Sequence, residues 1–112
     1  MEHQYRKILL DDCVTKKLIP YPKEHEVSTV SLRKWNGLRN GELLRKTEQD
    51  GFDIFLTIDK KIKHQQNIPD YNLIVIIIDS PSSAIEILSL YIPDLLSELN
   101  SFTKGNFYII KK

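Results

Sequence analysis

The chain of 112 residues lacks the sequence features of disulfide-bonded, membrane-spanning and polybasic proteins. Its single cysteine, Cys13, excludes an internal disulfide, so we expect a reducing, cytoplasmic location. Cys13 follows an apolar run and is expected to be a small buried residue rather than a nucleophile. The longest apolar run, 73–78, is far too short to span a bilayer, and the first residues, MEHQYRK, show no signal-peptide pattern. A formal net charge of +1 leaves nucleic-acid binding to a local patch.

The apolar residues are arranged as in a parallel α/β protein. Three short apolar runs each end in aspartate, as strands buried on both faces of a sheet would: ILLDD (8–12), IFLTID (54–59) and LIVIIID (73–79). Helical patterns lie between them, which favours βαβ crossovers. We therefore expect a single three-layer α/β domain over residues 1–112, with a mostly parallel sheet of four or five strands.

The boundaries of the predicted strands and helices are set by turn and capping residues. Strands are predicted at 6–12, 25–30, 52–59, 73–79 and 106–110, with 25–30 near a sheet edge because it alternates with polar residues. The first helix is expected at 14–19, and one helical turn is expected in the polar stretch after 59. Asn40 is predicted to cap a helix at 41–49 that Gly51 ends, and Ser80 to cap a helix from Pro81 that Pro93 kinks or splits.

The positions of the acids predict a site. Carboxyl ends of parallel strands meet at one edge, where α/β sheets bind ligands, so Asp11, Asp12, Asp59 and Asp79 should converge there. Carboxylates repel one another unless neutralised, and a hard divalent cation with oxygen ligands is the usual remedy. The simpler role of Asp12 is to cap a helix, and Asp79 could be an ordinary loop acid.

Two further residues belong to this prediction. Thr57 lies two positions before Asp59, on the same side of the strand, where its hydroxyl could orient the carboxylate or a metal-bound water. Glu42, in the first turn of a predicted helix, either complements the helix dipole or serves as a metal ligand.

Cations and amides flank the predicted site on both sides. A charge run is usually a solvated face, but here the two runs could hold a phosphate backbone and stack a base. The first run follows Asp59 and contains Lys60, Lys61, Lys63, His64, Gln65, Gln66 and Asn67. The second run precedes the helix at 41–49 and contains Arg33, Lys34, Trp35 and Arg39.

From residue 7 to about residue 99 the chain resembles the small PIN-like proteins found near toxin–antitoxin loci, and three segments carry the resemblance. The segments are KILLDD, WNGLRNGELLRKTEQDGFDIFLTIDKKIKHQQN and LIVIIID, and the sharpest parts are LLDD, NGELL and FLTIDKKI followed by QQN. The resemblance implies a PIN-type fold, an acidic pocket that binds Mg²⁺ or Mn²⁺, and metal-dependent cleavage of RNA. It also implies a cognate antitoxin protein as a partner.

The resemblance assigns roles to individual residues. Asp11 matches the family's first-strand aspartate, Asp59 matches its T-x-D signature, and Asn40 stands where an aspartate is common, leaving Glu42 as the nearby acid. The implied catalytic residues are Asp11, Glu42 and Asp59, and the strand-end argument adds Asp12 or Asp79 to complete the metal site. RNA contacts are expected from Arg39, Lys60, Lys61, Lys63, Gln65, Gln66 and Asn67. The chain is shorter than a standard PIN domain, so a catalytically degenerate nucleic-acid-binding module is an alternative.

A phosphoacceptor receiver domain is a second alternative. Receivers also carry an acidic pair after the first strand and an aspartate after the third, and Ser80 and Lys111 could supply the hydroxyl and the lysine that follow the fourth and fifth strands. The segment between Asp12 and Phe52 holds too little clear helix for two βα units, which counts against this reading.

A partner surface is expected near the C-terminal helix. An antitoxin, or a second copy of the chain in a homodimer, could contact the apolar residues Tyr91, Ile92 and Leu95. Ile92 and Leu95 fit the core better, whereas Tyr91, next to Pro93, is predicted to be exposed.

Overall fold

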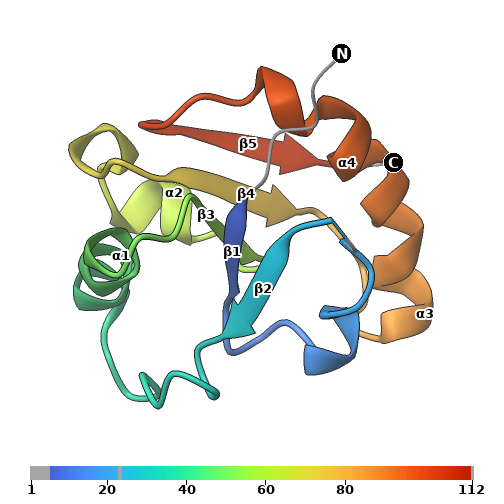
Figure 1. Ribbon diagram of the computed structural model, residues 1–112, viewed down its shortest axis with the longest axis horizontal. Helices are drawn as coiled ribbons and strands as arrows, with labels where there is room; N and C mark the ends of the chain where they lie inside the picture. Colours follow the sequence, from blue (N-terminus) through green and yellow to red (C-terminus); the bar gives the residue numbers. More distant parts are fainter. Residues whose placement is uncertain (1–5, 23, 112) are drawn as a thin grey trace.

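A computed structural model describes residues 6–22 and 24–111, which form one five-stranded, all-parallel sheet in the order β2-β1-β3-β4-β5 (Figure 1). The strands are β1 (Lys7–Leu10), β2 (Glu26–Thr29), β3 (Ile54–Thr57), β4 (Ile74–Ile78) and β5 (Asn106–Ile110). The α-helices are α1 (Asn40–Gln49), α2 (Ile62–Gln65), α3 (Ile85–Leu88) and α4 (Ile92–Glu98), and 3₁₀ turns occur at η1 (Lys16–Leu18), η2 (Ile68–Asp70), η3 (Ser89–Tyr91) and η4 (Leu99–Ser101).

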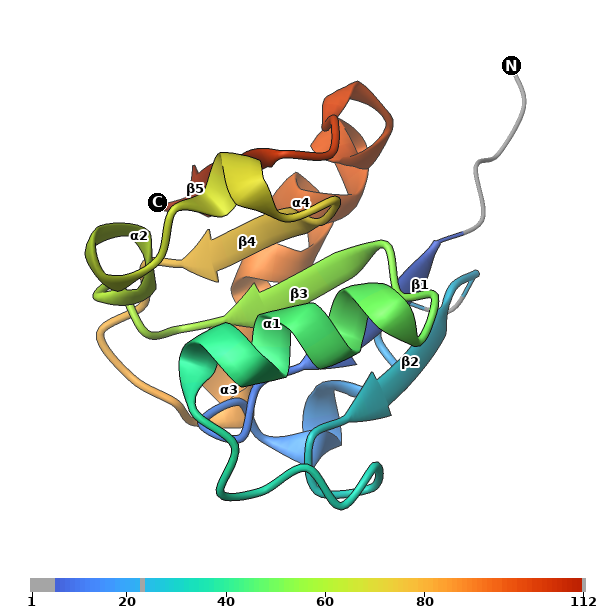
Figure 2. The same ribbon diagram turned by 90° about the vertical axis from the view of Figure 1, so that its left-hand side faces the viewer.

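Alternating strand residues supply two apolar cores, one on each face of the sheet. Leu56 and Ile76 pack with residues of η1, α3 and α4, whereas Phe55 and Val75 pack with residues of α1, α2 and η2. Figure 2 shows α1 in front of the sheet and α3 and α4 behind it. The predicted three-layer α/β architecture is confirmed.

The strand burial explains the apolar runs. Every residue of β3 and β4 is buried, because both strands have a neighbour on each side and a helical layer on each face. Strand β2 lies at the sheet edge, as its alternating sequence predicts, and only Thr29 in it is fully buried. None of the helices in the described part of the chain is long and apolar enough to cross a membrane.

Several predicted details of the helices are wrong. Helix α1 starts at Asn40 itself, after Arg39, and no side chain caps it. Helix α3 starts after Ala84, because the Ser80 hydroxyl donates to the carbonyl of Ser82 and forms a turn.

The C-terminal helix behaves partly as its sequence predicts. Pro93 does split the pattern: it occupies the first turn of α4, where the missing N–H costs nothing. Tyr91, predicted to be exposed, is only 5% exposed and belongs to the core together with Ile92 and Leu95.

The strand order places the topological switch point of the sheet between β1 and β3. From β1 the chain crosses through η1 on one face to β2, and it returns through α1 on the other face to β3. The connections that follow β1 and β3 therefore diverge, which is the arrangement that opens a binding crevice at the carboxyl edge of doubly wound sheets. Two βα units do fit between Asp12 and Phe52, because the first crossover needs only a 3₁₀ turn.

The two-sided core predicts how the chain responds to a small loss of packing. Ile76 is fully buried in β4, and Ile76→Val should lower the unfolding free energy of the protein by about 0.5–1.5 kcal/mol. Leu90 is 56% exposed, so Leu90→Ala should change the same quantity by less than about 0.5 kcal/mol. Urea denaturation followed by circular dichroism measures both, and an equal effect of the two variants would contradict this packing.

Candidate functional site

A buried hydroxyl links two aspartates at the switch point, Asp11 after β1 and Asp59 after β3. Thr57, the last residue of β3, is 0% exposed, and its Oγ1 donates to Asp11 Oδ2 at 2.6 Å. The same Oγ1 accepts the backbone N–H of Asp59 at 3.0 Å. The threonine of the T-x-D segment was predicted to orient the Asp59 carboxylate or a metal-bound water. Instead it orients the carboxylate of Asp11 and the backbone of Asp59.

Asp11 is also held by the backbone. Its N–H donates to the carbonyl of Leu56 at 2.8 Å, which extends the ladder between β1 and β3 by one bond. Its Oδ1 accepts the N–H of Asp12 at 2.7 Å. Oδ1 keeps lone-pair capacity after these bonds, so the half-exposed Asp11 remains able to bind a cation.

Cys13 lies beside this pair and is exposed, so the prediction that it is buried is wrong. Its sulfur is 3.5 Å from both Asp11 Oδ2 and Thr57 Oγ1. Partial burial of the sulfur, helped by the charge of Asp11, raises the pKa of the Cys13 thiol. A raised thiol pKa lowers the fraction of reactive thiolate.

Asp12 belongs to a separate polar group between β1 and β2. Its Oδ1 accepts hydrogen bonds from Ser31 Oγ and Asn36 Nδ2, both at 3.0 Å, and Asn36 also donates to Ser31 Oγ. The capping role considered for Asp12 is filled by Thr15, whose side chain accepts the N–H of Lys17.

Asp79 belongs to a third group. It follows β4, and its Oδ1 lies 2.6 Å from the Nζ of Lys60. This hydrogen-bonded lysine lowers the pKa of the Asp79 carboxyl below its ordinary value. Asp79 and Lys60, predicted as metal ligand and RNA contact, are thus paired with each other.

The expected convergence of the acids at one point is not observed. In residues 6–22 and 24–111, no three His, Cys, Asp or Glu side chains are grouped to hold a metal ion. Glu42 is exposed in the first turn of α1, and its carboxylate has no hydrogen bond within that part of the chain. A smaller ligand set still suits Mg²⁺, which keeps several waters and is commonly bound through one or two carboxylates. Asp11 and Asp59, linked through Thr57, provide oxygen donors of this kind.

The start of α1 packs against the loop that follows β3. Asn40 Nδ2 donates to Gln65 Oε1 at 3.3 Å. At Gly41 an added Cβ would lie 3.3 Å from Gln66 Oε1 and 3.7 Å from the Tyr71 hydroxyl, so a glycine permits this close approach.

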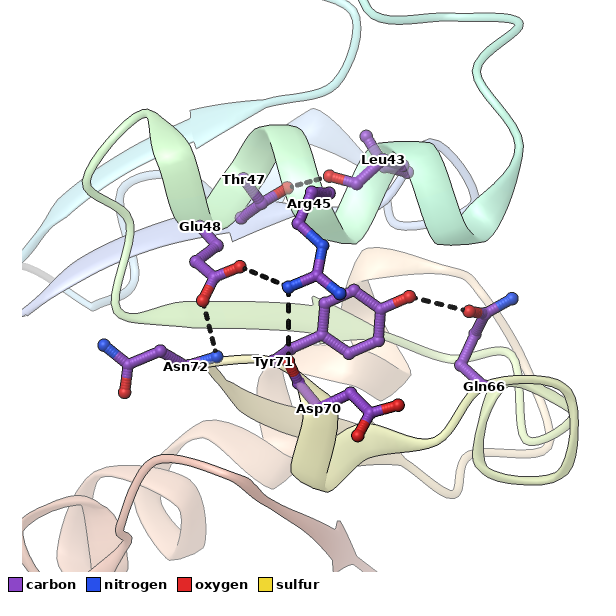
Figure 3. A network of polar contacts seen from close by, with 8 residues as sticks. All are labelled: Leu43, Arg45, Thr47, Glu48, Gln66, Asp70, Tyr71 and Asn72. Atoms are coloured by element: carbon purple, nitrogen blue, oxygen red, sulfur yellow. Dashed lines mark hydrogen bonds and ion pairs between the residues drawn. The ribbon is translucent and has the colours of Figure 1, made fainter.

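Sequence reasoning missed the network that holds this loop (Figure 3). The Tyr71 hydroxyl donates to Gln66 Oε1 at 2.9 Å, and the Arg45 guanidinium lies 4.4 Å from the centre of the Tyr71 ring. Arg45 also donates to Glu48 Oε1 and to the carbonyl of Asp70, while Glu48 Oε2 accepts the N–H of Asn72. The i,i+3 spacing of Arg45 and Glu48 was a visible signal for a helix-surface pair.

This network changes the roles expected of the loop. The side-chain oxygens of Gln65 and Gln66, both predicted to contact RNA, accept hydrogen bonds from Asn40 and Tyr71. Lys61 and Asn67 are exposed and Lys63 is half-exposed.

The basic run before α1 is divided between the two edges of the sheet. Arg39, next to the start of α1, is exposed. Arg33 pairs with Asp50 at the end of α1, which lies at the opposite edge, and its guanidinium is over the rings of Trp35 and Phe52. Trp35, expected to help stack a base, is half-buried and packs edge-on against Phe52.

Comparison of the chain with protein-family models, curated proteins and solved structures found no match.

The link through Thr57 predicts a specific stability difference. Thr57→Val keeps the shape but removes a hydrogen bond to a charged group, so the unfolding free energy should fall by about 1.5–3 kcal/mol. Thr57→Ser keeps the hydroxyl and loses one methyl group, at a cost of about 0.8 kcal/mol. Urea denaturation compares the two variants. A valine variant that is more stable than the serine variant would contradict the role of the hydroxyl.

Proposed function

We propose that this chain is a metal-dependent ribonuclease of the PIN-like type and acts as the toxin of a toxin–antitoxin pair. The observation that supports this most is the group Asp11, Thr57 and Asp59 at the carboxyl ends of the adjacent strands β1 and β3. Of the segments that resemble PIN-like proteins, LLDD supplies Asp11 and FLTIDKKI supplies Thr57 and Asp59, while NGELL supplies Glu42.

In this proposal Asp11 and Asp59 hold Mg²⁺ or Mn²⁺. The bound ion would lower the pKa of a water molecule and stabilise charge on the scissile phosphate. Glu42, whose carboxylate is free of hydrogen bonds within the described residues, would accept the proton of the attacking water. Lys61 and Lys63 would hold the RNA backbone, and Thr57 keeps the Asp11 carboxylate in position.

The proposed partners are single-stranded RNA and an antitoxin protein. The partner surface needs a new location, because Tyr91 is buried. Leu90 and Leu96, on η3 and α4, are 56% and 38% exposed and are the apolar residues of that region which an antitoxin or a second copy would contact.

Loss of either aspartate should abolish cleavage. Purified protein is incubated with single-stranded RNA and Mn²⁺, and the cleavage rate is compared with those of Asp11→Asn and Asp59→Asn. We expect each rate to fall by more than about 100-fold, since even residues behind the direct ligands contribute 10- to 100-fold in metal sites. Asp70→Asn, an exposed aspartate in η2, is the matched control and should retain full activity. Equal residual cleavage in all four proteins would point to a contaminant and contradict the proposal.

The strand order favours one further candidate, a phosphoacceptor receiver. The order β2-β1-β3-β4-β5 is that of flavodoxin-like folds, which include receivers. The hydroxyl of Ser80, however, donates to the Ser82 carbonyl, and Lys60 pairs with Asp79. Incubation with acetyl phosphate and Mg²⁺ followed by mass spectrometry separates the two functions. A nuclease should gain no mass, whereas a phosphoryl group on Asp59 that is lost in Asp59→Asn would establish the receiver.

A further inference from the structure

A second hollow lies beside the Asp11 group, between the ends of β1 and β2. Its volume is about 430 Å³, within the range of small-molecule sites, and its walls include Asp11, Asp12, Lys16, Ser31 and Leu32. Asp11 belongs both to this pocket and to the candidate metal group. A nucleotide whose phosphate lay at Asp11 would therefore have its sugar and base within reach of the pocket.

The polar wall of the pocket presents one fixed hydrogen-bond acceptor. Asp12 Oδ1 accepts from both Ser31 Oγ and Asn36 Nδ2, which fixes the plane of the carboxylate. Asp12 Oδ2 has no hydrogen bond within the described residues, so it is available to a ligand that donates one. Leu32, 66% exposed, gives the pocket an apolar wall, and Lys16 gives it a positive charge.

We propose that this pocket binds a nucleobase that carries an exocyclic amino group. The amino group would donate to Asp12 Oδ2, as cytosine N4 does to aspartate in nucleic-acid complexes, and the ring would lie against Leu32. Uracil presents a carbonyl oxygen at the same position, which a carboxylate cannot bind. The inference rests on the proposed function for the role of the pocket, which is to select the base next to the cleaved phosphate.

Binding of two mononucleotides tests the pocket without any cleavage. Metal-free protein labelled with ¹⁵N is titrated with cytidine and with uridine 5′-monophosphate, which differ in the pyrimidine ring only at position 4 and the adjoining nitrogen. We expect cytidine monophosphate to bind about 5- to 10-fold more tightly, with shifted amide signals at Asp12, Ser31 and Leu32. Equal affinities, or no binding of either nucleotide, would overturn the inference.

Asp12→Asn should reverse this preference. Ser31 and Asn36 both donate to the oxygen at the Oδ1 position, so they favour the amide orientation that keeps the carbonyl there. The NH₂ group then occupies the free position and donates to O4 of uracil instead of accepting from cytosine. We expect uridine monophosphate to bind the variant better than cytidine monophosphate. A variant that keeps the preference for cytidine would overturn the role of Asp12.

Two further variants separate the apolar wall from general effects. Leu32→Ala removes apolar contact from both ligands and should weaken both without changing their ratio. Asp70→Asn removes a negative charge outside the pocket and should leave both affinities unchanged. If Asp70→Asn reversed the preference as Asp12→Asn does, overall charge would explain the result and the inference would fail.

The outcomes for the pocket and for the nuclease are distinguishable. Selective nucleotide binding by a chain that does not cleave RNA supports the pocket and counts against the ribonuclease. Cleavage of RNA that shows no preference for cytosine over uracil beside the cut, and that Asp12→Asn does not alter, supports the ribonuclease and overturns the pocket's proposed role.

Discussion

The candidate site depends on the buried hydroxyl of Thr57. This group is closed off from water, and it donates to a carboxylate from one strand while it accepts a backbone N–H from the loop of another. A buried hydroxyl without such bonds would be costly, so the contact fixes the Asp11 carboxylate relative to the backbone of Asp59. An alanine or valine here would remove the donor that orients the Asp11 carboxylate, whereas the Asp59 carboxylate would keep its bond from the N–H of Lys61.

The alternation of residues along β1 and β3 determines on which face of the sheet Asp11, Thr57 and Asp59 lie. Odd-numbered residues of β1 and β3 point toward the core beneath α1, and the residues that continue the pattern past the strand ends are Asp11 and Asp59. Helix α1 starts at the same edge, where Arg45 and Tyr71 hold its neighbouring loop. The crossover through η1 opens the other side of the edge, where Asp12 faces the pocket. One topological feature therefore supplies both the proposed metal group and the proposed base site.

The sequence predicts the sheet well because burial on both faces requires runs such as IFLT and IVIII. It also places Asp11 and Asp59 at the same edge of the sheet, since strand polarity determines this. The adjacency of β1 and β3 depends on the strand order, which the sequence did not predict. It does not predict which charges pair. Lys60 neutralises Asp79 and Arg33 reaches Asp50 because loop geometry brings those side chains together, and no local pattern encodes that geometry. Asn40 is a good N-cap by residue type, yet its amide binds Gln65, a contact between segments far apart in the sequence.

The most direct test of the central claim is a crystal structure of the protein with Mn²⁺, in which anomalous scattering locates the ion. We expect one strong peak beside the carboxyl ends of β1 and β3, at about 2.0–2.3 Å from carboxylate oxygens of both Asp11 and Asp59, with water completing the shell. The peak should be absent from crystals of Asp11→Asn. A Mn²⁺ ion bound elsewhere, or held by Asp12 or Asp79 without Asp11, would contradict the account.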